Sequence, residues 1–338
     1  MPKYRDMFGC EHENIYEVSA KIPDMYVYEF DNAFCFTDRE EIFTKNYEVI
    51  LEHTSQKNNP LLNNIITKRE IIKIGKSVAQ ISLNGLENNY GHHLIEYLSR
   101  YWLLRESGIK PDYYIMTKTE KFQQQWLDLL DIDINRIIPS DTRVLIQAKN
   151  LIVPSLTNNW KPIHYRGYEG YAKQWIPSWL ITCYREKFLP DFLRKINLRT
   201  GGCAKRIYIS RGAAERRKIL NEDELLPILK RNKFEICILE NLDVKEQINL
   251  FIEAEIVAGV HGAGLGNIIF TDKNTKVMEI FSQYYLDYAF RVLATCLGIH
   301  YNYIVGQSIN TENVHPQEEN FIISPAKFEQ AIDMLIHM

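Results

Sequence analysis

The chain is predicted to be an α/β protein of 338 residues built mainly on parallel β-sheet. In its second half, apolar strand-like runs alternate with helix-like segments at regular intervals, a pattern typical of a parallel sheet covered by helices on both faces. The first half opens with β-rich segments and then adopts the same strand–helix–strand rhythm. At this length we expect two domains, residues 1–185 and 186–338.

The first domain begins with four short segments that mix β-branched and aromatic residues between turn-prone residues. They are Met25–Phe30, Tyr47–Leu51, Glu70–Ile74 and Val78–Leu83, with a turn at Gly75-Lys76. Apolar residues at three- and four-residue steps then predict a helix from Asn89 to Glu106, before Gly108 and Pro111 end it. A βαβ unit is predicted after it, from strand Tyr113–Met116, helix Glu120–Leu130 and strands near 136–138 and 150–153.

Residues 155–180 are aromatic and are predicted to be irregular. The second domain follows with a cleaner alternation of strands and helices. The predicted strands are Arg206–Ser210, Phe234–Leu239, 255–260, Lys276–Phe281 and Tyr301–Val305, and the predicted helices are Leu225–Arg231, Gln247–Ala254 and Tyr285–Leu297. Asn221 and the pair Asp243 and Glu246 have the spacing of helix-capping residues.

The composition excludes some classes of protein. With 40 Lys and Arg against 43 Asp and Glu, the chain lacks the basic excess of a dedicated nucleic-acid binder. The six cysteines are scattered without a Cys-x-x-Cys pair, so we expect free thiols in a reducing compartment. The chain opens without an apolar signal segment and has no run long enough to span a membrane. We therefore expect a cytoplasmic protein, with association to a membrane face through partners left open.

A glycine-rich loop, Gly259-Val-His-Gly-Ala-Gly-Leu-Gly-Asn-Ile-Ile269, is the most informative segment of the sequence. It follows an apolar strand and includes His261 and Asn267. Glycines allow a backbone to approach a ligand closely, and a helix starting here would point N–H groups and partial positive charge at it. The loop differs from the dinucleotide fingerprint and from the P-loop. It suits a diphosphate, the alternative being glycines that serve only tight packing.

Two further charged residues are predicted near the same sheet edge. Arg211 directly follows strand Arg206–Ser210, where open α/β sheets bind ligands, and a guanidinium there can clamp a diphosphate. Glu279 lies within an apolar strand, where a carboxylate needs hydrogen-bond donors such as ribose hydroxyls. The alternatives are a solvent-exposed arginine and a surface glutamate. Arg217, in the basic run Arg216–Lys218, is a weaker candidate, since such runs are commonly solvated loops.

A candidate general base lies near the start of the helix predicted from Asn89. If Asn89 caps that helix, His92 and Glu96 stand four residues apart on one face. A carboxylate beside an imidazole fixes its tautomer and raises its basicity, which suits a general base. The alternative is a structural histidine. His93 points elsewhere.

Taken together, these residues resemble glycosyltransferase family 61. In the second half the resemblance rests on Ile209-Ser-Arg211, Arg216-Arg217, Asn221-Glu222, Glu246-Gln247, His261-Gly-Ala-Gly-Leu265, Asn267 and Glu279. In the first half it rests on Asn89-Tyr-Gly-His92 with Leu94 and Glu96. The family usually has an aromatic residue after the first histidine, whereas this chain has His93.

The resemblance implies a GT-B architecture, in which two Rossmann-like domains face a cleft and the C-terminal one holds the nucleotide-sugar. It also implies inversion at the anomeric carbon, no metal requirement and no other cofactor. Catalysis would fall to His92 and Glu96, with Asn89 and Arg217 as additional candidates near the substrates. The donor-binding set would be Arg211, His261, Gly262, Ala263, Gly264, Leu265, Asn267 and Glu279.

The predicted activity is transfer of a sugar from a UDP-linked donor to a hydroxyl of a glycan acceptor, in capsular or other surface polysaccharide synthesis. The partners expected are the nucleotide-sugar, the glycan and membrane-bound polysaccharide machinery on the inner face, without nucleic acid. Two alternatives remain open. A sugar-nucleotide epimerase would share the donor site but need no acceptor, and a non-catalytic sensor would bind UDP without turnover.

Overall fold

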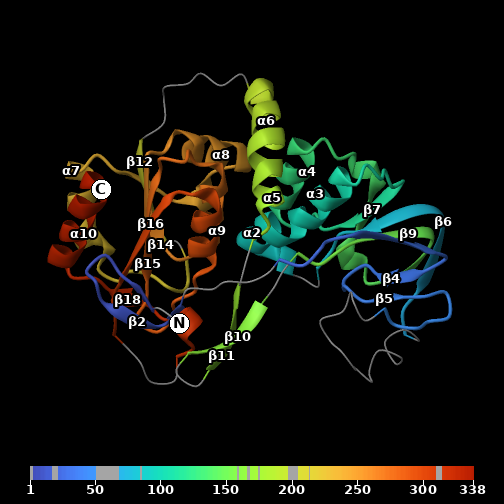
Figure 1. The fold of residues 1–338 in the computed structure, drawn as a ribbon, viewed down its shortest axis with the longest axis horizontal. Helices are drawn as coiled ribbons and strands as arrows, with labels where there is room; N and C mark the ends of the chain where they lie inside the picture. The colour runs from blue at the N-terminus through green and yellow to red at the C-terminus, as the bar shows by residue number, and fades with distance from the viewer. Residues whose placement is uncertain are drawn as a thin grey trace. The chain divides into compact units, whose positions relative to one another are not determined.

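The computed structural model describes residues 3–16, 22–50, 68–83, 86–157, 160–165, 168–173, 176–196, 205–212, 214–309 and 314–338. They form two compact units (Figure 1). Unit 1 comprises Met1–Ile22 and Asn158–Met338, and unit 2 comprises Pro23–Thr157. Each contains parallel β-sheet and helices, which confirms the predicted α/β class. The GT-B arrangement stays a prediction.

The predicted domain boundary after residue 185 lies inside unit 1. It falls within a continuous helical segment, made of α5 (Ser178–Thr182), a π-helix (η6, Cys183–Phe188) and α6 (Leu189–Ile196). The ring of Tyr184 packs 5.7 Å from that of Phe270, between centroids. The Arg185 guanidinium donates to the carbonyl of Ile269 over 3.3 Å. These contacts tie the segment to the glycine-rich loop, so it groups with the C-terminal sheet.

Unit 1 is built on a five-stranded parallel sheet in the order β13-β12-β14-β15-β16. The strands are β12 (Arg206–Ile209), β13 (Glu235–Cys237), β14 (Ile256–Val260), β15 (Lys276–Phe281) and β16 (His300–Val305). After β12 the chain first adds β13 on one side of β12 and then β14 on the other side. The direction of winding therefore reverses between β12 and β14. In open α/β sheets, ligands bind beyond the carboxyl ends of the strands at such a switch point.

The helices of unit 1 follow the predicted order, with one addition. After the α5–α6 segment come α7 (Glu222–Arg231), α8 (Val244–Glu253), α9 (Ala289–Leu297) and the added α10 (Pro325–His337). The capping box predicted for α8 is confirmed, because Asp243 accepts from the Glu246 amide over 2.8 Å and Glu246 accepts from the Asp243 amide over 2.7 Å. Asn221 precedes α7, but its amide pairs with the backbone of Ile323 instead of capping.

The helix α10 was not predicted from sequence. Its fully buried Phe328, Ile332 and Leu335 join the core beneath the sheet, with α7 on the same side. Smaller elements complete unit 1. They are β1 (Lys3–Arg5), β2 (Glu11–Tyr16), β10 (Trp160–Tyr165), β11 (Tyr168–Lys173), β17 (Gln307–Ser308) and β18 (Phe321–Ile322). Strands β10 and β11 form an antiparallel hairpin, so the prediction of an irregular segment is wrong there.

Unit 2 contains a seven-stranded mixed sheet in the order β5-β4-β9-β6-β7-β8, with β3 also paired to β9. The strands are β3 (Val27–Asp31), β4 (Phe34–Phe36), β5 (Ile42–Phe43), β6 (Ile71–Gln80), β7 (Tyr113–Met116), β8 (Ile137–Pro139) and β9 (Leu145–Pro154). Strands β6 to β9 pair in parallel, as the predicted βαβ unit requires.

Two strand predictions in unit 2 are wrong. The predicted turn at Gly75-Lys76 lies within the single strand β6, because a register shift against β9 absorbs these residues as an irregularity. The strand predicted over residues 47–51 is reduced to a bridge between Phe43 and Val49. Tyr47 adopts a left-handed φ of 64°, which interrupts an extended chain.

The predicted helix from Asn89 to Glu106 is present in three continuous parts. They are α2 (Tyr90–His92), a π-helix (η3, His93–Tyr97) and α3 (Leu98–Glu106). Asn89 caps it as predicted, since its side-chain oxygen accepts from the amides of Gly91 and His92 over 2.9 and 3.3 Å. The helix α4 (Lys121–Leu129) follows β7 with a capping box at Glu120.

Over the residues described, no helix is both long and apolar enough to cross a bilayer. The cysteines in those residues, Cys10, Cys35, Cys183, Cys237 and Cys296, are all free thiols. Cys35 is fully buried, and burial raises the pKa of its thiol.

Candidate donor site and candidate base

The glycine-rich loop and Arg211 meet at the switch point of the unit 1 sheet. Arg211 follows β12 closely, and the loop follows β14, the neighbouring strand. A Cβ on Gly259 would come within 2.8 Å of the Cβ of Ile209, so only glycine allows the two strand ends this spacing. A Cβ on Gly262 would collide with Nη1 of Arg211. The guanidinium therefore lies directly against the loop backbone.

A second arginine lies in the same site. Arg217 is half-buried, with its guanidinium carbon 5.3 Å from the centre of the Tyr285 ring, and its backbone has a left-handed φ of 56°. Burial and the neighbouring charge of Arg217 lower the pKa of Arg211 to about 10. Burial and the charge of Arg216 also lower the pKa of Arg217. The structure thus brings Arg217 into the predicted site and leaves Arg216 exposed.

Neither arginine forms an ion pair with a carboxylate within the residues that the structure describes, and the Nε of each is buried there without a hydrogen-bond partner. Acidic side chains act on them without such a contact, Glu240 on Arg211, and Asp287 and Glu279 on Arg217. In the described residues Arg211 donates one hydrogen bond, from Nη2 to the carbonyl of Arg216 over 3.2 Å. Two half-buried guanidiniums beside a helix start favour binding of an anionic ligand.

His261 lies at the end of β14 and is 6% exposed. Its Nδ1 is 2.5 Å from Oε1 of Glu279. Its ring stacks on Phe281 with centroids 5.3 Å apart and contacts Tyr285 at its edge. Burial, with the positive charges of Arg217 and Arg211, holds the pKa of His261 well below its usual value. The imidazole is therefore neutral near pH 7.

Glu279 is enclosed within the sheet of unit 1. It is fully buried in β15, and its second carboxyl oxygen accepts from the Tyr301 hydroxyl. Burial raises the pKa of this carboxyl well above its usual range. The surface alternative is wrong, because the side chain contacts His261 and Tyr301 inside the sheet, and the contact with ribose stays a prediction.

The side chains of Asn267 and Leu265 are both buried within unit 1, and their predicted roles in donor binding stay predictions. Asn267 is fully buried and donates to Oε1 of Gln247 on α8 over 2.9 Å, while Gln247 donates to the carbonyl of Leu239. The Leu265 side chain is 1% exposed and lies in the core. Of the 3₁₀-helix that opens here (η8, Ala263–Phe270), the first residues Ala263 and Gly264 are the half-exposed ones. The part of the loop open to a ligand is its first turn.

The predicted contact between His92 and Glu96, the candidate general base and its partner, forms within unit 2. Nδ1 of His92 is 3.1 Å from Oε1 of Glu96. The Glu96 side chain is 2% exposed and that of His92 is 29% exposed. Glu96 lies in the π-helix η3, and π-helical turns are frequent at functional sites. A buried carboxylate thus supports a half-exposed imidazole, which is the arrangement required of an oriented base.

The family model described as Glycosyltransferase 61 matches residues 90–278, more than half of the chain. This chain belongs to glycosyltransferase family 61. The match includes His92, Glu96, Arg211 and His261, and it ends one residue before Glu279.

Curated relatives carry transferase names. The chain is 26% identical over 235 residues to the EGF domain-specific O-linked N-acetylglucosamine transferase of Mus musculus, which covers 63% of this chain and 42% of the relative. The enzyme of that name from Pan troglodytes is 31% identical over 34% of this chain and 23% of its own. The β-1,2-xylosyltransferase RCN11 of Oryza sativa subsp. japonica is 32% identical over 26% of this chain and 18% of its own. The chain thus spans less than half the length of these relatives.

His93, where the family usually has an aromatic residue, behaves as one. It is 1% exposed, stacks on Tyr97 with ring centroids 4.6 Å apart and meets the edge of Phe122 at 5.2 Å. Burial lowers the pKa of His93 to about 3, so the ring is uncharged at neutral pH. The departure from the family pattern keeps an aromatic surface in the core.

Sequence reasoning missed two features of this family member. Tyr301 was placed in a strand but not linked to Glu279, since the contact depends on how β15 and β16 pair. A hollow in unit 2 was also missed, although Thr117 directly follows one predicted strand and Ser140 lies two residues beyond another, at the ligand-binding edge of a parallel sheet.

In the described residues, no group of three or more His, Cys, Asp or Glu side chains is arranged to hold a metal ion. The sequence does contain Asp131-Ile132-Asp133, an Asp-x-Asp arrangement. It lies in the turn after α4, where Asp133 accepts from the amide of Asn135 over 2.9 Å. Asp133 therefore has a local capping role.

Proposed function

We propose that this chain is an inverting, metal-independent glycosyltransferase that moves a sugar from a UDP-linked donor to a hydroxyl of a glycan. Membership of family 61 supports glycosyl transfer. The observation that carries the donor assignment is the pair of half-buried arginines, Arg211 and Arg217, without carboxylate partners in the described chain. Their guanidiniums are not engaged in an ion pair there, which supports binding of an anionic ligand.

The donor diphosphate would bind across these arginines and the first turn of η8. As the bond from the anomeric carbon to the diphosphate oxygen breaks, its electron pair leaves with the diphosphate. Preorganised donors stabilise charge that develops in this way, and guanidinium groups bind phosphate oxygens two at a time. The helix dipole adds a further favourable term, so the charge can be offset without a divalent ion.

His261 would donate a hydrogen bond from Nε2 to the same anion. The burial-raised pKa of Glu279 favours a protonated carboxyl, which donates to Nδ1 of His261 while the Tyr301 hydroxyl donates to its other oxygen. Because Nδ1 of His261 accepts this hydrogen bond, the proton of its neutral imidazole lies on Nε2. Glu279 and Tyr301 are then positioning residues that act through His261.

The acceptor would be activated by His92. With Nδ1–H donated to the buried Glu96 carboxylate, Nε2 is free to take the proton of the acceptor hydroxyl. The acceptor oxygen forms its bond to the anomeric carbon on the face opposite the diphosphate, which inverts the configuration. The exposures of the two side chains favour His92 as the base and Glu96 as the residue that orients it.

The deciding experiment measures donor binding and transfer separately. Calorimetry with UDP should show binding to the wild-type chain, to His92→Ala and to Glu96→Gln with similar affinity. Transfer should fall by about 10²–10⁴-fold in both variants, the usual contribution of a general base. Unchanged transfer in His92→Ala would remove it as the base.

The same assays distinguish the alternatives. Donor consumption that saturates without any acceptor would indicate an epimerase, and UDP binding without turnover would indicate a sensor. Loss of activity in EDTA with recovery in Mn²⁺ would contradict metal independence. A thermal-shift panel of nucleotide-sugars would identify the donor, because a bound ligand raises apparent stability by mass action. The names of the relatives put N-acetylglucosamine and xylose first in that panel.

We also propose that the acceptor is a capsular or other surface polysaccharide, made on the cytoplasmic face of a membrane with membrane-bound partners. The family resemblance motivates this assignment. Fractionation of the native cells tests it: the protein should sediment partly with membranes and be released by salt. Recovery outside the cytoplasm would refute it.

A further inference from the structure

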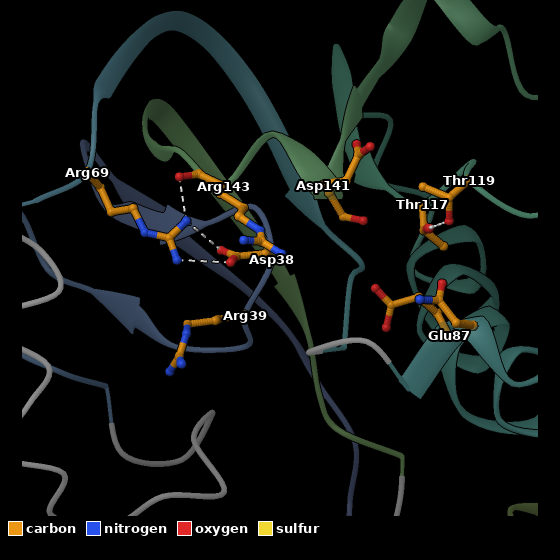
Figure 2. Close-up of a pocket in the computed structure, with 10 residues that line it drawn as sticks. Asp38, Arg39, Arg69, Glu87, Thr117, Thr119, Asp141 and Arg143 are labelled. Atoms are coloured by element: carbon orange, nitrogen blue, oxygen red, sulfur yellow. Dashed lines mark hydrogen bonds and ion pairs between the residues drawn. The ribbon is translucent and has the colours of Figure 1, made fainter.

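Unit 2 contains a hollow of about 450 Å³ at the edge of its sheet (Figure 2). It is lined by Asp38, Arg39, Arg69, Glu87, Asn88, Thr117, Thr119, Ser140, Asp141 and Arg143. Thr117 follows the last residue of β7, and Ser140 follows the last residue of β8. The hollow therefore lies beyond the carboxyl ends of parallel strands, where α/β sheets bind ligands, and its volume suits a small molecule.

One buried side chain, Gln123, holds together one side of the hollow through hydrogen bonds. Gln123 is fully buried and accepts hydrogen bonds from Thr117 and Thr119 over 3.0 and 3.2 Å. Its amide donates to the carbonyl of Glu87 and to the side chain of Asn88, both over 3.0 Å. One side chain thus locks two loops together before any ligand arrives, and such preorganisation lowers the cost of binding.

The opposite side is fixed in a similar way. The Arg69 guanidinium donates to both carboxyl oxygens of Asp38, over 3.2 and 2.9 Å. The Arg39 carbonyl accepts from the Gln80 amide over 2.7 Å, which anchors this segment at the end of β6. Figure 2 shows Arg39 and Arg69 on one side of the hollow and Glu87, Thr117 and Thr119 on the other.

The charges that line the hollow balance. Three arginines and three acids line it, the acids being Asp38, Glu87 and Asp141. Arg69 forms an ion pair with Asp38, and Arg39 forms one with Glu41, so a phosphate or another anion has no excess positive charge to meet here. A sugar ring suits the lining better, because its hydroxyls can accept from the Arg143 guanidinium and donate to the Asp141 carboxylate.

The hollow is connected to the candidate base through the chain. Glu87 and Asn88 line it and directly precede Asn89, the residue that caps the helix bearing His92. We propose that this hollow binds an uncharged sugar unit of the acceptor, with Asp141, Arg143 and Thr119 at its rim as the specificity-determining contacts. The assignment to the acceptor rests on the proposed transferase function, whereas sugar binding itself does not.

The test uses the full chain labelled with ¹⁵N and follows its amide resonances. The uncharged probes are methyl β-D-xyloside and methyl N-acetyl-β-D-glucosaminide, and the charged probes are methyl β-D-glucuronide and inorganic phosphate. We expect saturable shifts of the Thr119, Ser140 and Asp141 amides with an uncharged probe. Asp141→Ala should weaken that binding about tenfold or more, as expected for a lost hydrogen bond to a charged group.

The matched control is Asp128→Asn, which changes an exposed acid of α4 that does not line the hollow. It should leave the sugar affinity unchanged. Shifts at these amides with the charged probes alone would overturn the proposal in favour of an anion site, and no saturable shift with any probe would also overturn it. UDP calorimetry on the same samples separates the proposed transferase function from the proposed sugar site. A chain that does not bind UDP would count against the transferase and not against the sugar site.

Discussion

Buried arginines behave differently in the two units, although burial lowers the pKa of Arg100 and of Arg211 alike, to about 10. Arg100 in unit 2 is 1% exposed and donates five hydrogen bonds. Its acceptors are the carbonyls of Ile81, Ser82 and Pro154 and the side chain of Gln80. Arg211 in unit 1 has one such bond and a buried Nε without any in the described residues.

The difference separates a structural cation from a ligand-binding one. The donors of Arg100 satisfy carbonyls at the ends of β6 and β9, so its burial is compensated within the fold. Arg211 and Arg217 each keep a buried Nε without a hydrogen-bond partner in the described residues. A bound anion could accept from these donors. A structural arginine is therefore distinguished from a ligand-binding one by whether its N–H groups have hydrogen-bond acceptors within the protein, and not by how deeply it is buried. The predictions below test this distinction.

The largest effect on stability is expected for Arg100→Met. Each buried carbonyl that loses its partner costs about 1–3 kcal/mol, so the free energy of unfolding should fall by at least about 3 kcal/mol. Denaturant unfolding measures it. The control is Arg105→Met, an exposed arginine of the same helix, which should change stability little. Equal losses of unfolding free energy in Arg100→Met and Arg105→Met would contradict a structural role for Arg100.

Arg211→Met should have the opposite profile. Removal of one preorganised donor costs about 10²–10³ in rate, and UDP affinity should fall with it. The thermal midpoint of the ligand-free chain should stay unchanged or rise, because replacing a buried charge with an apolar group is often stabilising. Arg216→Met, which alters the exposed neighbour, is the control for UDP affinity. A destabilised Arg211→Met with normal UDP binding would make Arg211 structural.

The histidines repeat the contrast and give a pH prediction. The pKa of His93 is about 3 in the folded chain against 6.5 unperturbed, so below pH 6.5 the unfolded chain binds a proton that the folded chain does not. Stability should therefore fall as the pH drops from 6.5 towards 3, by about 2 kcal/mol at pH 5. His93→Phe should remove this loss and keep UDP binding, whereas His261→Phe should impair UDP binding. If the wild type and His93→Phe lose the same free energy of unfolding as the pH falls, His93 is not the source of the acid sensitivity.

Local patterns predicted much of this arrangement. The spacing of His92 and Glu96, the Asn89 cap and the loop after β14 depend on residues within one helical turn or one strand end, and all three form as expected. The partners of Glu279 were not predictable, because they depend on the pairing of β14, β15 and β16. The role of Arg100 is equally non-local, since its acceptors come from residues 80–82 and 154.

The smallest effect is expected for Tyr301→Phe. This substitution tests whether the ligand-binding groups of unit 1 depend on the buried hydrogen bonds of Glu279. The substitution removes one hydroxyl from Glu279 and leaves the His261–Glu279 contact in place. Loss of one such hydrogen bond is worth about 1 kcal/mol, so UDP affinity should fall about fivefold. The ¹⁵N shifts of His261 report its tautomer, and a smaller fraction of the Nε2–H form should accompany the weaker binding. Weaker UDP binding with an unchanged tautomer would show that Tyr301 acts on the fold of the site and not through His261.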